Sequence, residues 1–228
     1  MADFHFIEDY EKHVANLVKI YPIDEAMSLA VGGSYDHIGA IECSILRYAG
    51  LKNGQKIIDF GCGSGRLAVH VSREFDISYL GLDVVQQLLN YAKTKTPKHY
   101  EYLLNRNLSI PSSNESVDWF TAFSVFTHLL HSESFIYLHD MYRCLIPGGK
   151  VVASFLEFEH MPHWHVFEAT VNQQRNSTTP HLNQFIERNQ FRVWASNIGF
   201  SEVEFIDGNA APWSSGHALG QSIVIFTK

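Results

Sequence analysis

Apolar residues follow two alternating patterns through the middle of the chain. Short apolar runs, typical of buried strands, are separated by longer stretches in which apolar residues recur every three to four positions, as on the inner face of a helix. The runs predict strands at residues 56–60, 77–83, 100–105, 117–125 and 150–158. The longer stretches predict helices at residues 34–50, about 66–74, around Leu88, Leu89 and Ala92, and about 134–145. This alternation indicates a mostly parallel sheet with a ligand crevice at the carboxyl ends of its strands.

The pattern changes after residue 158. About 40 residues rich in His, Asn and aromatic side chains come before the next strand, more than one crossover helix needs. Helices are predicted around 182–189 and near 193–198, the second ended by Gly199. Strands at 203–206 and 221–228 are predicted as an antiparallel pair at the sheet edge. The predicted fold is α/β, a Rossmann-like, doubly wound sheet of seven mostly parallel strands with an antiparallel edge strand.

Composition and charge narrow the possible partners. The 228 residues, 46% hydrophobic and 18% charged, are enough for one globular domain with a full core. The formal net charge is −7 and the basic residues are scattered, which disfavours a nucleic-acid partner. The N-terminal residues contain no apolar h-region, so we expect no signal peptide, no membrane anchor and a cytoplasmic location. Cys43, Cys62 and Cys144 are odd in number and far apart, which favours reduced thiols.

Three glycines, Gly61, Gly63 and Gly65, follow the strand predicted at 56–60 and precede a helix. A glycine-rich turn at such a place lets bare backbone approach a ligand closely. The dinucleotide fingerprint GxGxxG requires a glycine three positions after the second one, where this chain has Arg66. The spacing therefore disfavours NAD and FAD.

Two acids accompany these glycines. Asp59 lies two residues before the first glycine, where it would repel a phosphate but suit a cationic amino-acid group. Asp83 ends the next predicted strand, where a carboxylate can accept hydrogen bonds from both ribose hydroxyls. A nucleoside with a cationic amino-acid tail and no phosphate satisfies both acids, and S-adenosylmethionine is such a molecule.

The segment IIDFGCGSGR resembles the first motif of class I S-adenosylmethionine-dependent methyltransferases, and YLGLDVV resembles their second-strand motif. The segment NRNLSIPSSNESVDWFTAFSVFTHL is similar to the family stretch from the adenine-binding turn through strand four, and LIPGGKVV to the segment before strand five. The resemblance covers roughly residues 50–158 and implies S-adenosylmethionine as cofactor and S-adenosylhomocysteine as product. The cofactor-binding residues that it implies are Asp59, Gly61, Cys62, Gly63, Gly65, Asp83, Val84, Asn107, Leu108, Phe123 and Ser124.

The chain also departs from parts of the family pattern. The adenine-binding turn commonly has an Asp where this chain has Asn107. The Asp/Asn-Pro-Pro-aromatic motif of enzymes that methylate adenine bases or glutamine is absent, since strand four ends FSVFTH. Those two acceptors are therefore disfavoured, and a likeness through AVGGSYDHIG and GHALGQSIVIF is to small bacterial methyltransferases of the small-molecule type.

Several residues are candidates for the acceptor side. His128 follows strand four and suits a general base near neutral pH, with capping or packing as the alternative. Tyr35 is expected to close over the cofactor from the N-terminal side, or to pack there. The run EFEHMPHWHVFE holds Glu157, His160 and His163, which we expect to line or cover the acceptor pocket. It lacks the helical HExxH spacing and contains a proline, so no metal site is predicted.

These observations predict a single domain over residues 1–228. Its parts are an N-terminal helical lid (1–50), a cofactor-binding core (51–158), a substrate-side insert (159–199) and edge strands (200–228). The predicted function is in-line methyl transfer from S-adenosylmethionine to an oxygen, nitrogen or carbon of a small-molecule acceptor. Two alternatives stay open, a non-catalytic binding or partner subunit of the same fold and a nicotinamide oxidoreductase. No membrane partner is expected, and a homodimer is left open.

Overall fold

The computed structural model describes residues 7–176 and 183–228, which divide into two compact units. The first unit contains the described residues up to Asn107 together with Pro212–Gly216. The second contains the described residues of Leu108–Ala211 and His217–Lys228. The single domain over the whole chain stays a prediction.

The first unit begins with helices and continues with alternating strands and helices. Its elements are α1 (Ile7–Ile20), α2 (Ile23–Ala30), α3 (Tyr35–Ala49), β1 (Lys56–Phe60), α4 (Arg66–Glu74), β2 (Ser78–Asp83), α5 (Gln86–Lys95) and β3 (Glu101–Leu104). Strand β1 pairs in parallel with β2, and β2 pairs in parallel with β3. The strands and helices predicted for residues 34–105 are therefore present, with ends shifted by at most a few residues.

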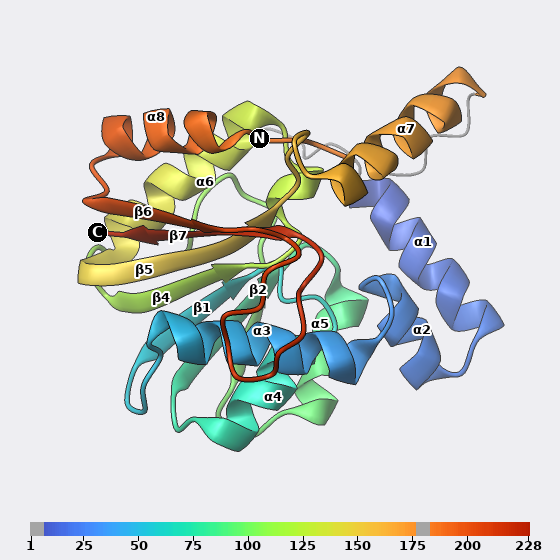
Figure 1. Ribbon diagram of the computed structural model, residues 1–228. Coiled ribbons are helices and arrows are strands. Elements are labelled where there is room, and N and C mark those ends of the chain that lie inside the picture. The colour runs from blue at the N-terminus through green and yellow to red at the C-terminus, as the bar shows by residue number, and fades with distance from the viewer. Residues whose placement is uncertain (1–6, 177–182) are drawn as a thin grey trace. The chain divides into compact units, whose positions relative to one another are not determined.

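Helices α3 and α4 lie side by side in the first unit (Figure 1). A Cβ atom on Gly39 of α3 would lie 2.4 Å from the Arg66 carbonyl oxygen of α4, so only glycine allows this approach. The inner face of α4 buries Leu67, Ala68 and Val71, which are the positions that the helical pattern predicts. Gly50 ends α3 with a φ of 103°, a conformation that favours glycine.

The second unit contains the other strands. Its elements are β4 (Val117–Ala122), the short 3-10 helix η1 (Phe126–His128), α6 (His131–Cys144), β5 (Leu145–Phe155), α7 (Met161–Arg175), α8 (Arg188–Ile198), β6 (Glu202–Ile206) and β7 (Ser222–Thr227). Strands β4 and β5 are parallel, whereas β7 runs antiparallel to both β5 and β6. Figure 1 shows α8 beside α6, and the two helices are in contact.

The strands are ordered β3-β2-β1-β4-β5-β7-β6 in a seven-stranded sheet. This order, with its antiparallel edge and flanking helices, confirms the predicted Rossmann-like α/β fold. The predicted antiparallel pairing of the last two strands is also confirmed.

The prediction was wrong in part after strand five. The first predicted helix, around 182–189, is not formed over residues 183–187, and residue 182 lies outside the described part of the chain. Helix α8 instead begins at Arg188 and continues through the second predicted helix, near 193–198, to Ile198. Helix α7 was not predicted, because Pro162 suggested an interruption. A proline is well accommodated in the first turn of a helix, where its missing N–H group has no helical partner, and Pro162 lies there.

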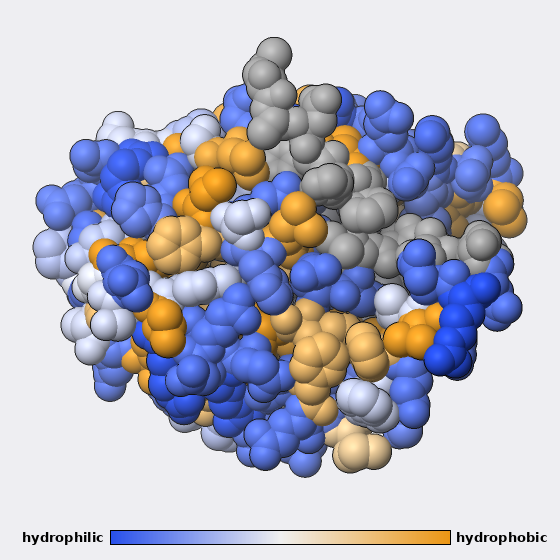
Figure 2. Space-filling model, turned by 90° about the horizontal axis from the view of Figure 1, so that it is seen from above, coloured by the Kyte–Doolittle hydropathy of each residue, from blue (hydrophilic) through white to orange (hydrophobic). Residues whose placement is uncertain are grey.

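The surface seen in Figure 2 is mainly hydrophilic, with hydrophobic residues in small, scattered groups. Within residues 7–176 and 183–228, no helix is both long enough and apolar enough to cross a membrane.

Cys43, Cys62 and Cys144 are all buried and form no disulfide.

Candidate functional site

The glycine loop joins β1 to α4 in the first unit. The φ angles of Gly61, Gly63 and Gly65 are 73°, 55° and 84°, which a residue with a Cβ atom rarely adopts. The N–H groups of Gly61 and Cys62 donate to the Leu82 carbonyl oxygen at 2.8 and 3.0 Å. The loop therefore stays attached to the end of β2 after β1 itself has ended.

Asp83, the last residue of β2, holds this loop with its side chain. Its Oδ2 accepts a hydrogen bond from the Gly63 N–H at 2.8 Å, and its Oδ1 accepts one from the Val85 N–H at 2.9 Å. The residue is only 7% exposed. Burial raises the pKa of Asp83 to about 6, although the N–H groups of Val85, Gly63 and Val84 favour the charged form. At neutral pH the site therefore presents a buried, mainly ionised carboxylate.

Asp59 and Cys62 lie beside this carboxylate. Asp59 is 3% exposed, and its Oδ2 accepts a hydrogen bond from the Tyr79 hydroxyl of β2 at 2.6 Å. Burial, helped by the negative charges of Asp83 and Asp59, raises the pKa of the Cys62 thiol well above its usual range. A protonated, buried thiol is a poor nucleophile, so Cys62 contributes shape to the loop.

The turn between α2 and α3 lies against the glycine loop. The Ser64 hydroxyl donates to the Met27 carbonyl oxygen at 2.9 Å, and the Tyr35 hydroxyl donates to the Ser64 carbonyl oxygen at the same distance. The Val31 Cγ1 atom lies 2.6 Å from the place where a Cβ atom on Gly63 would be. The structure thus brings Tyr35 to the glycine loop.

Arg66, which occupies the third position of the dinucleotide fingerprint, ties the N-terminal helices together. Its Nε donates to Glu42 Oε1 of α3 at 2.9 Å, and another guanidinium nitrogen donates to the Val31 carbonyl oxygen at 2.6 Å. Burial raises the pKa of Glu42 to about 7, against the opposing charge of Arg66. A small residue at this position would lose these contacts.

The segment after β3 flanks Asp83 from the other side. The Asn105 N–H donates to the Asp83 carbonyl oxygen at 2.9 Å, and the Asn107 N–H donates to Asn105 Oδ1 at 3.3 Å. Asn107 is itself exposed, whereas Asn105 is buried. The sequence analysis placed Asn105 at the end of the strand predicted at 100–105 but did not name it as a site residue, although a polar residue at the carboxyl end of a strand is a usable signal.

In the second unit, a residue with strained backbone lies two positions after the end of β4. Ser124 has a φ of 57°, its N–H donates to the Ser154 hydroxyl at 2.7 Å, and its hydroxyl donates to Gln221 Oε1 at 3.3 Å. Such strain in a residue other than glycine is common at functional sites. Two other residues of the second unit were predicted to bind the cofactor, and of these Phe123 is buried and Leu108 is half-buried.

His128, the predicted base, is the last residue of η1 and is exposed. Its N–H donates to the Val125 carbonyl oxygen at 2.9 Å, which fixes the backbone of the short helix. Its role in proton transfer stays a prediction.

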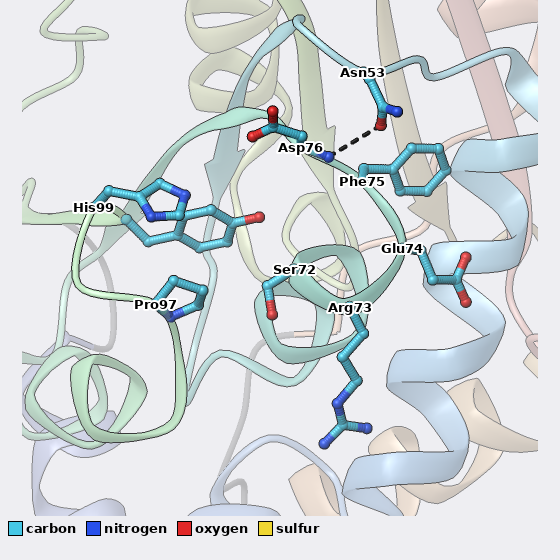
Figure 3. Close-up of a pocket in the computed structure, with 9 residues that line it drawn as sticks. Asn53, Ser72, Arg73, Glu74, Phe75, Asp76, Pro97 and His99 are labelled. Atoms are coloured by element: carbon cyan, nitrogen blue, oxygen red, sulfur yellow. Dashed lines mark hydrogen bonds between the residues drawn. The ribbon is translucent and has the colours of Figure 1, made fainter.

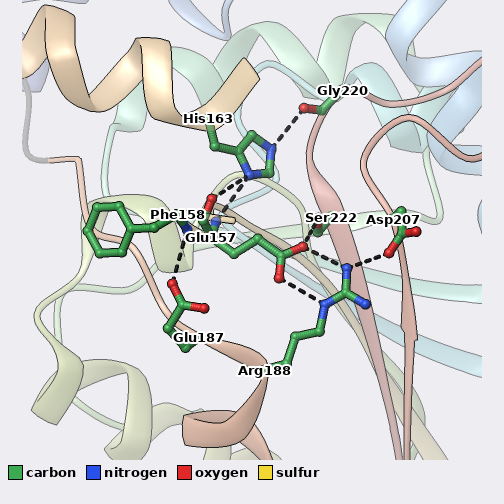
Figure 4. A network of polar contacts seen from close by, with 8 residues as sticks. All are labelled: Glu157, Phe158, His163, Glu187, Arg188, Asp207, Gly220 and Ser222. Atoms are coloured by element: carbon green, nitrogen blue, oxygen red, sulfur yellow. Dashed lines mark hydrogen bonds and ion pairs between the residues drawn. The ribbon is translucent and has the colours of Figure 1, made fainter. Parts of the chain in front are cut away.

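Glu157 lies at the centre of a polar network beyond the end of β5 (Figure 4). Its carboxylate accepts two hydrogen bonds from Arg188, at 2.8 and 2.7 Å, and one from the Ser222 hydroxyl at 2.5 Å. Arg188 also pairs with Asp207 at 2.5 Å. Burial alone would raise the pKa of Glu157, but the bonds from Arg188 and Ser222 lower it overall. The carboxylate is therefore an ionised anchor that joins α8 to β7.

His163, in the first turn of α7, is bonded to backbone on both sides of its ring (Figure 4). The Glu157 N–H donates to Nδ1 at 3.1 Å, and Nε2 donates to the Gly220 carbonyl oxygen at 3.0 Å. Burial lowers the pKa of His163, and the neighbouring His160 acts in the same direction. The ring is thus neutral and fixes α7 to the residues that follow β5 and precede β7.

These contacts describe the predicted acceptor residues individually. Glu157 and His163 are only 2% and 1% exposed, whereas His160 is half-buried. Their place in an acceptor pocket stays a prediction. The sequence analysis missed Arg188 and Ser222, because nothing in their local pattern shows that they meet Glu157.

Two further features bear on ligand binding. Within the described residues, no group of three or more His, Cys, Asp or Glu side chains is arranged to hold a metal ion. A hollow of about 300 Å³ lies in the first unit between the end of α4 and the residues before β3 (Figure 3). Arg73, Asp76 and His99 are among its lining residues, and none of the predicted site residues lines it. It faces the amino ends of β2 and β3, away from the glycine loop.

Comparison with known proteins supports the methyltransferase function that the sequence predicts. Residues 58–153 match the family model of a methyltransferase domain. The U6 snRNA methylphosphate capping enzyme Amus of Drosophila melanogaster is 23% identical over 78% of this chain, and the match spans 64% of that protein.

Solved structures share the fold over most of the chain. A chain from the complex between the Haloferax volcanii Trm112 methyltransferase activator and a methyltransferase has a TM-score of 0.68 at 17% identity, with 100% of this chain and 98% of that chain covered. Haemonchus contortus phosphoethanolamine N-methyltransferase 2, solved with S-adenosyl-L-methionine, has a TM-score of 0.65 at 17% identity, with 91% and 46% covered.

Residues 58–153 thus contain a methyltransferase domain, and the fold is shared with S-adenosylmethionine-dependent methyltransferases of known structure. The predicted cofactor is confirmed at the level of the family.

Proposed function

We propose that this methyltransferase transfers the methyl group to an oxygen, nitrogen or carbon of a small-molecule acceptor. The observation that supports cofactor binding most directly is the buried carboxylate of Asp83, fixed by the N–H groups of Gly63 and Val85. A carboxylate accepts about four hydrogen bonds, so Asp83 can accept from both ribose hydroxyls beside its two backbone donors. A nucleoside without phosphates also suits a site that contains Asp59 as a second buried acid.

The residues of the chain then have to orient the reactants and exclude water. When the cofactor is bound, its sulfonium group supplies a methyl group that is already activated for displacement. Positioning of the acceptor in line with that group accounts for much of the rate in such a reaction. We propose His128 as the group that takes a proton from a hydroxyl or amine acceptor, a step that an acidic acceptor does not need.

Charge is the observation that favours a small molecule over RNA. The chain carries 24 acidic and 17 basic residues, which gives a formal charge of −7. A protein of this charge repels the phosphodiester backbone of RNA unless its basic residues are concentrated in one patch. The Drosophila relative, by its name, forms a methylphosphate cap on an snRNA, so the terminal phosphate of an RNA is the second candidate acceptor.

Isothermal titration with S-adenosylmethionine, S-adenosylhomocysteine and NAD tests the cofactor site. We expect binding of both sulfur compounds and none of NAD, with Asp83→Asn as the matched variant that weakens both. Binding of NAD instead would indicate the oxidoreductase alternative. No binding of any of the three would favour the alternative of a non-catalytic partner subunit.

Transfer of a tritiated methyl group tests the acceptor. The wild type would be incubated with pools of small hydroxyl, amine and ring compounds, and in parallel with 5′-phosphorylated RNA. Incorporation into a small-molecule pool that Asp83→Asn abolishes supports the proposal. Incorporation into RNA alone contradicts it and establishes the second candidate.

A further inference from the structure

Helix α1 packs on the residues that surround the predicted nucleoside site of the first unit. Val14 of α1 is fully buried in a cluster with Met27, Ala30, Val85 and Leu88. The cluster also includes half-buried hydrophobic residues on both sides, among them Tyr10 of α1 and Val84. Because Val84 and Val85 directly follow Asp83, α1 covers the chain next to the ribose-binding acid.

Arg106 links helix α1 to Val84, the residue that follows Asp83. Its Nε donates to the Val84 carbonyl oxygen at 3.0 Å, on the ribose side. A second guanidinium nitrogen forms an ion pair with Glu11 of α1. Arg106 also directly precedes Asn107, the residue predicted to contact adenine. One side chain therefore connects α1, the residue after Asp83 and the adenine turn.

Tyr10 provides an independent sign that α1 reaches the site. Its hydroxyl donates to the Ala30 carbonyl oxygen of α2 at 3.0 Å. Burial raises the pKa of Tyr10 above its usual range, with Asp83 acting in the same direction and Arg66 opposing it. The phenol is thus within electrostatic reach of the ribose acid and of the first residue of α4.

Helix α2 continues the cover over the glycine loop, because its Met27 carbonyl oxygen accepts a hydrogen bond from the Ser64 hydroxyl and Val31, which follows the helix, packs on Gly63. The turn that follows contains three consecutive residues with positive φ, namely Gly32 at 90°, Gly33 at 81° and Ser34 at 49°. Such a turn can absorb a change of backbone direction without disturbing α3. The segment from α1 to this turn thus contacts the residues that follow Asp83, Arg106 beside the predicted adenine turn, and the glycine loop.

We propose that Arg106 is a positioning residue of the cofactor site, and that its ion pair with Glu11 latches α1 over the nucleoside, so that release of this latch limits cofactor exchange. The proposal rests on the proposed binding of S-adenosylmethionine at Asp83. The latch is suited to reversible opening, because both partners are about two-fifths exposed, at 42% for Arg106 and 40% for Glu11. An exposed pair contributes little to folding, typically below about 1 kcal/mol, so it can be broken without unfolding the helix.

Stopped-flow kinetics of S-adenosylhomocysteine binding and dissociation test the latch. Glu11→Gln removes the ion pair but leaves the bond from Arg106 to Val84. We expect both the association and the dissociation rate constants to rise by about two- to fivefold, because opening precedes entry as well as exit. The dissociation constant should then stay within about twofold of the wild type. Glu8→Gln, on the exposed side of the same helix, changes the net charge equally and should change neither rate.

Arg106→Gln removes both contacts and gives a second signature. We expect the dissociation rate constant to rise more than the association rate constant, so that affinity falls by about tenfold, as the loss of a charged hydrogen bond to Val84 implies. In the wild type, 0.5 M salt should screen the exposed pair and speed exchange, with little effect in Glu11→Gln.

The outcomes separate the two proposals. Failure of the wild type to bind S-adenosylhomocysteine would overturn the proposed function, whatever α1 does. Normal binding with wild-type rates in Glu11→Gln would overturn the latch. A rise in the dissociation rate constant alone would also overturn it, because Glu11 would then be a bound-state contact and not part of a gate.

Discussion

Arg188→Met should destabilise the chain because it leaves the Glu157 carboxylate buried without its cation. Glu157 is 2% exposed and accepts two bonds from Arg188 and one from Ser222. Removal of one partner of a buried ion pair typically costs 3–5 kcal/mol. The Arg188 side chain is 30% exposed, so water can partly replace it, and we expect a loss of about 3 kcal/mol in the free energy of unfolding.

The pH dependence of this loss distinguishes an unpaired charge from lost packing. In the wild type, the folded-state pKa of Glu157 lies below its unfolded value, so the stability from the pair is complete above the unfolded pKa and is lost as the pH falls through the folded pKa. In Arg188→Met, burial raises the folded-state pKa above the unfolded value. The variant should therefore regain stability as the pH falls through that raised pKa and Glu157 takes up a proton.

The assay is urea unfolding, followed by far-ultraviolet circular dichroism at pH 7.5 and 5.5. The difference between wild type and Arg188→Met should narrow clearly at pH 5.5. A double variant, Glu157→Gln with Arg188→Met, removes the charge altogether and should recover much of the loss at pH 7.5. An equal difference at both pH values, with no recovery in the double variant, would refute the reasoning.

Other predictions concern the cofactor site and the base. Asp83→Asn should weaken S-adenosylhomocysteine binding by about 1–3 kcal/mol with the fold kept, and unchanged affinity in isothermal titration would count against the ribose assignment. Gly63→Ala should lower the melting temperature, because it places a Cβ atom at a φ of 55° and 2.6 Å from Val31 Cγ1; adding Val31→Ala should restore part of the loss, and no recovery would contradict the packing argument. His128→Ala should lower turnover and spare S-adenosylhomocysteine affinity, whereas full activity in a methyl-transfer assay would assign His128 to packing.

Much of the first unit could be predicted from the sequence, because its signals are local. The apolar run at 56–60, which contains Asp59, and the glycines that follow it specify a buried strand and a turn that only glycine tolerates. The helical periodicity fixed α4 and its inner residues Leu67 and Val71. Asp83 could be placed at the end of β2 from its position in the run alone.

The sequence was less informative after strand five, where the signals are not local. Helix α7 begins at a segment whose proline suggested a break, and its position depends on His163 bonding to the backbone of residues 157 and 220. The identity of Glu157 gave no indication that Arg188 and Ser222 would neutralise and bury it. Such partners, 31 and 65 residues away, are set by the packing of α8 and β7 and leave no periodic signal.

By itself, then, the sequence determined the alternation of strands and helices from α3 to β5, the glycine loop and the two acids, since each depends on residues within one short segment. The tertiary structure decided which distant groups meet those residues. It placed Tyr35 and Val31 on the glycine loop, and it joined Arg106 to Glu11. The physical reason is that hydrogen bonds and ion pairs between remote segments form only after the apolar faces have packed, so their partners are specified by the fold as a whole.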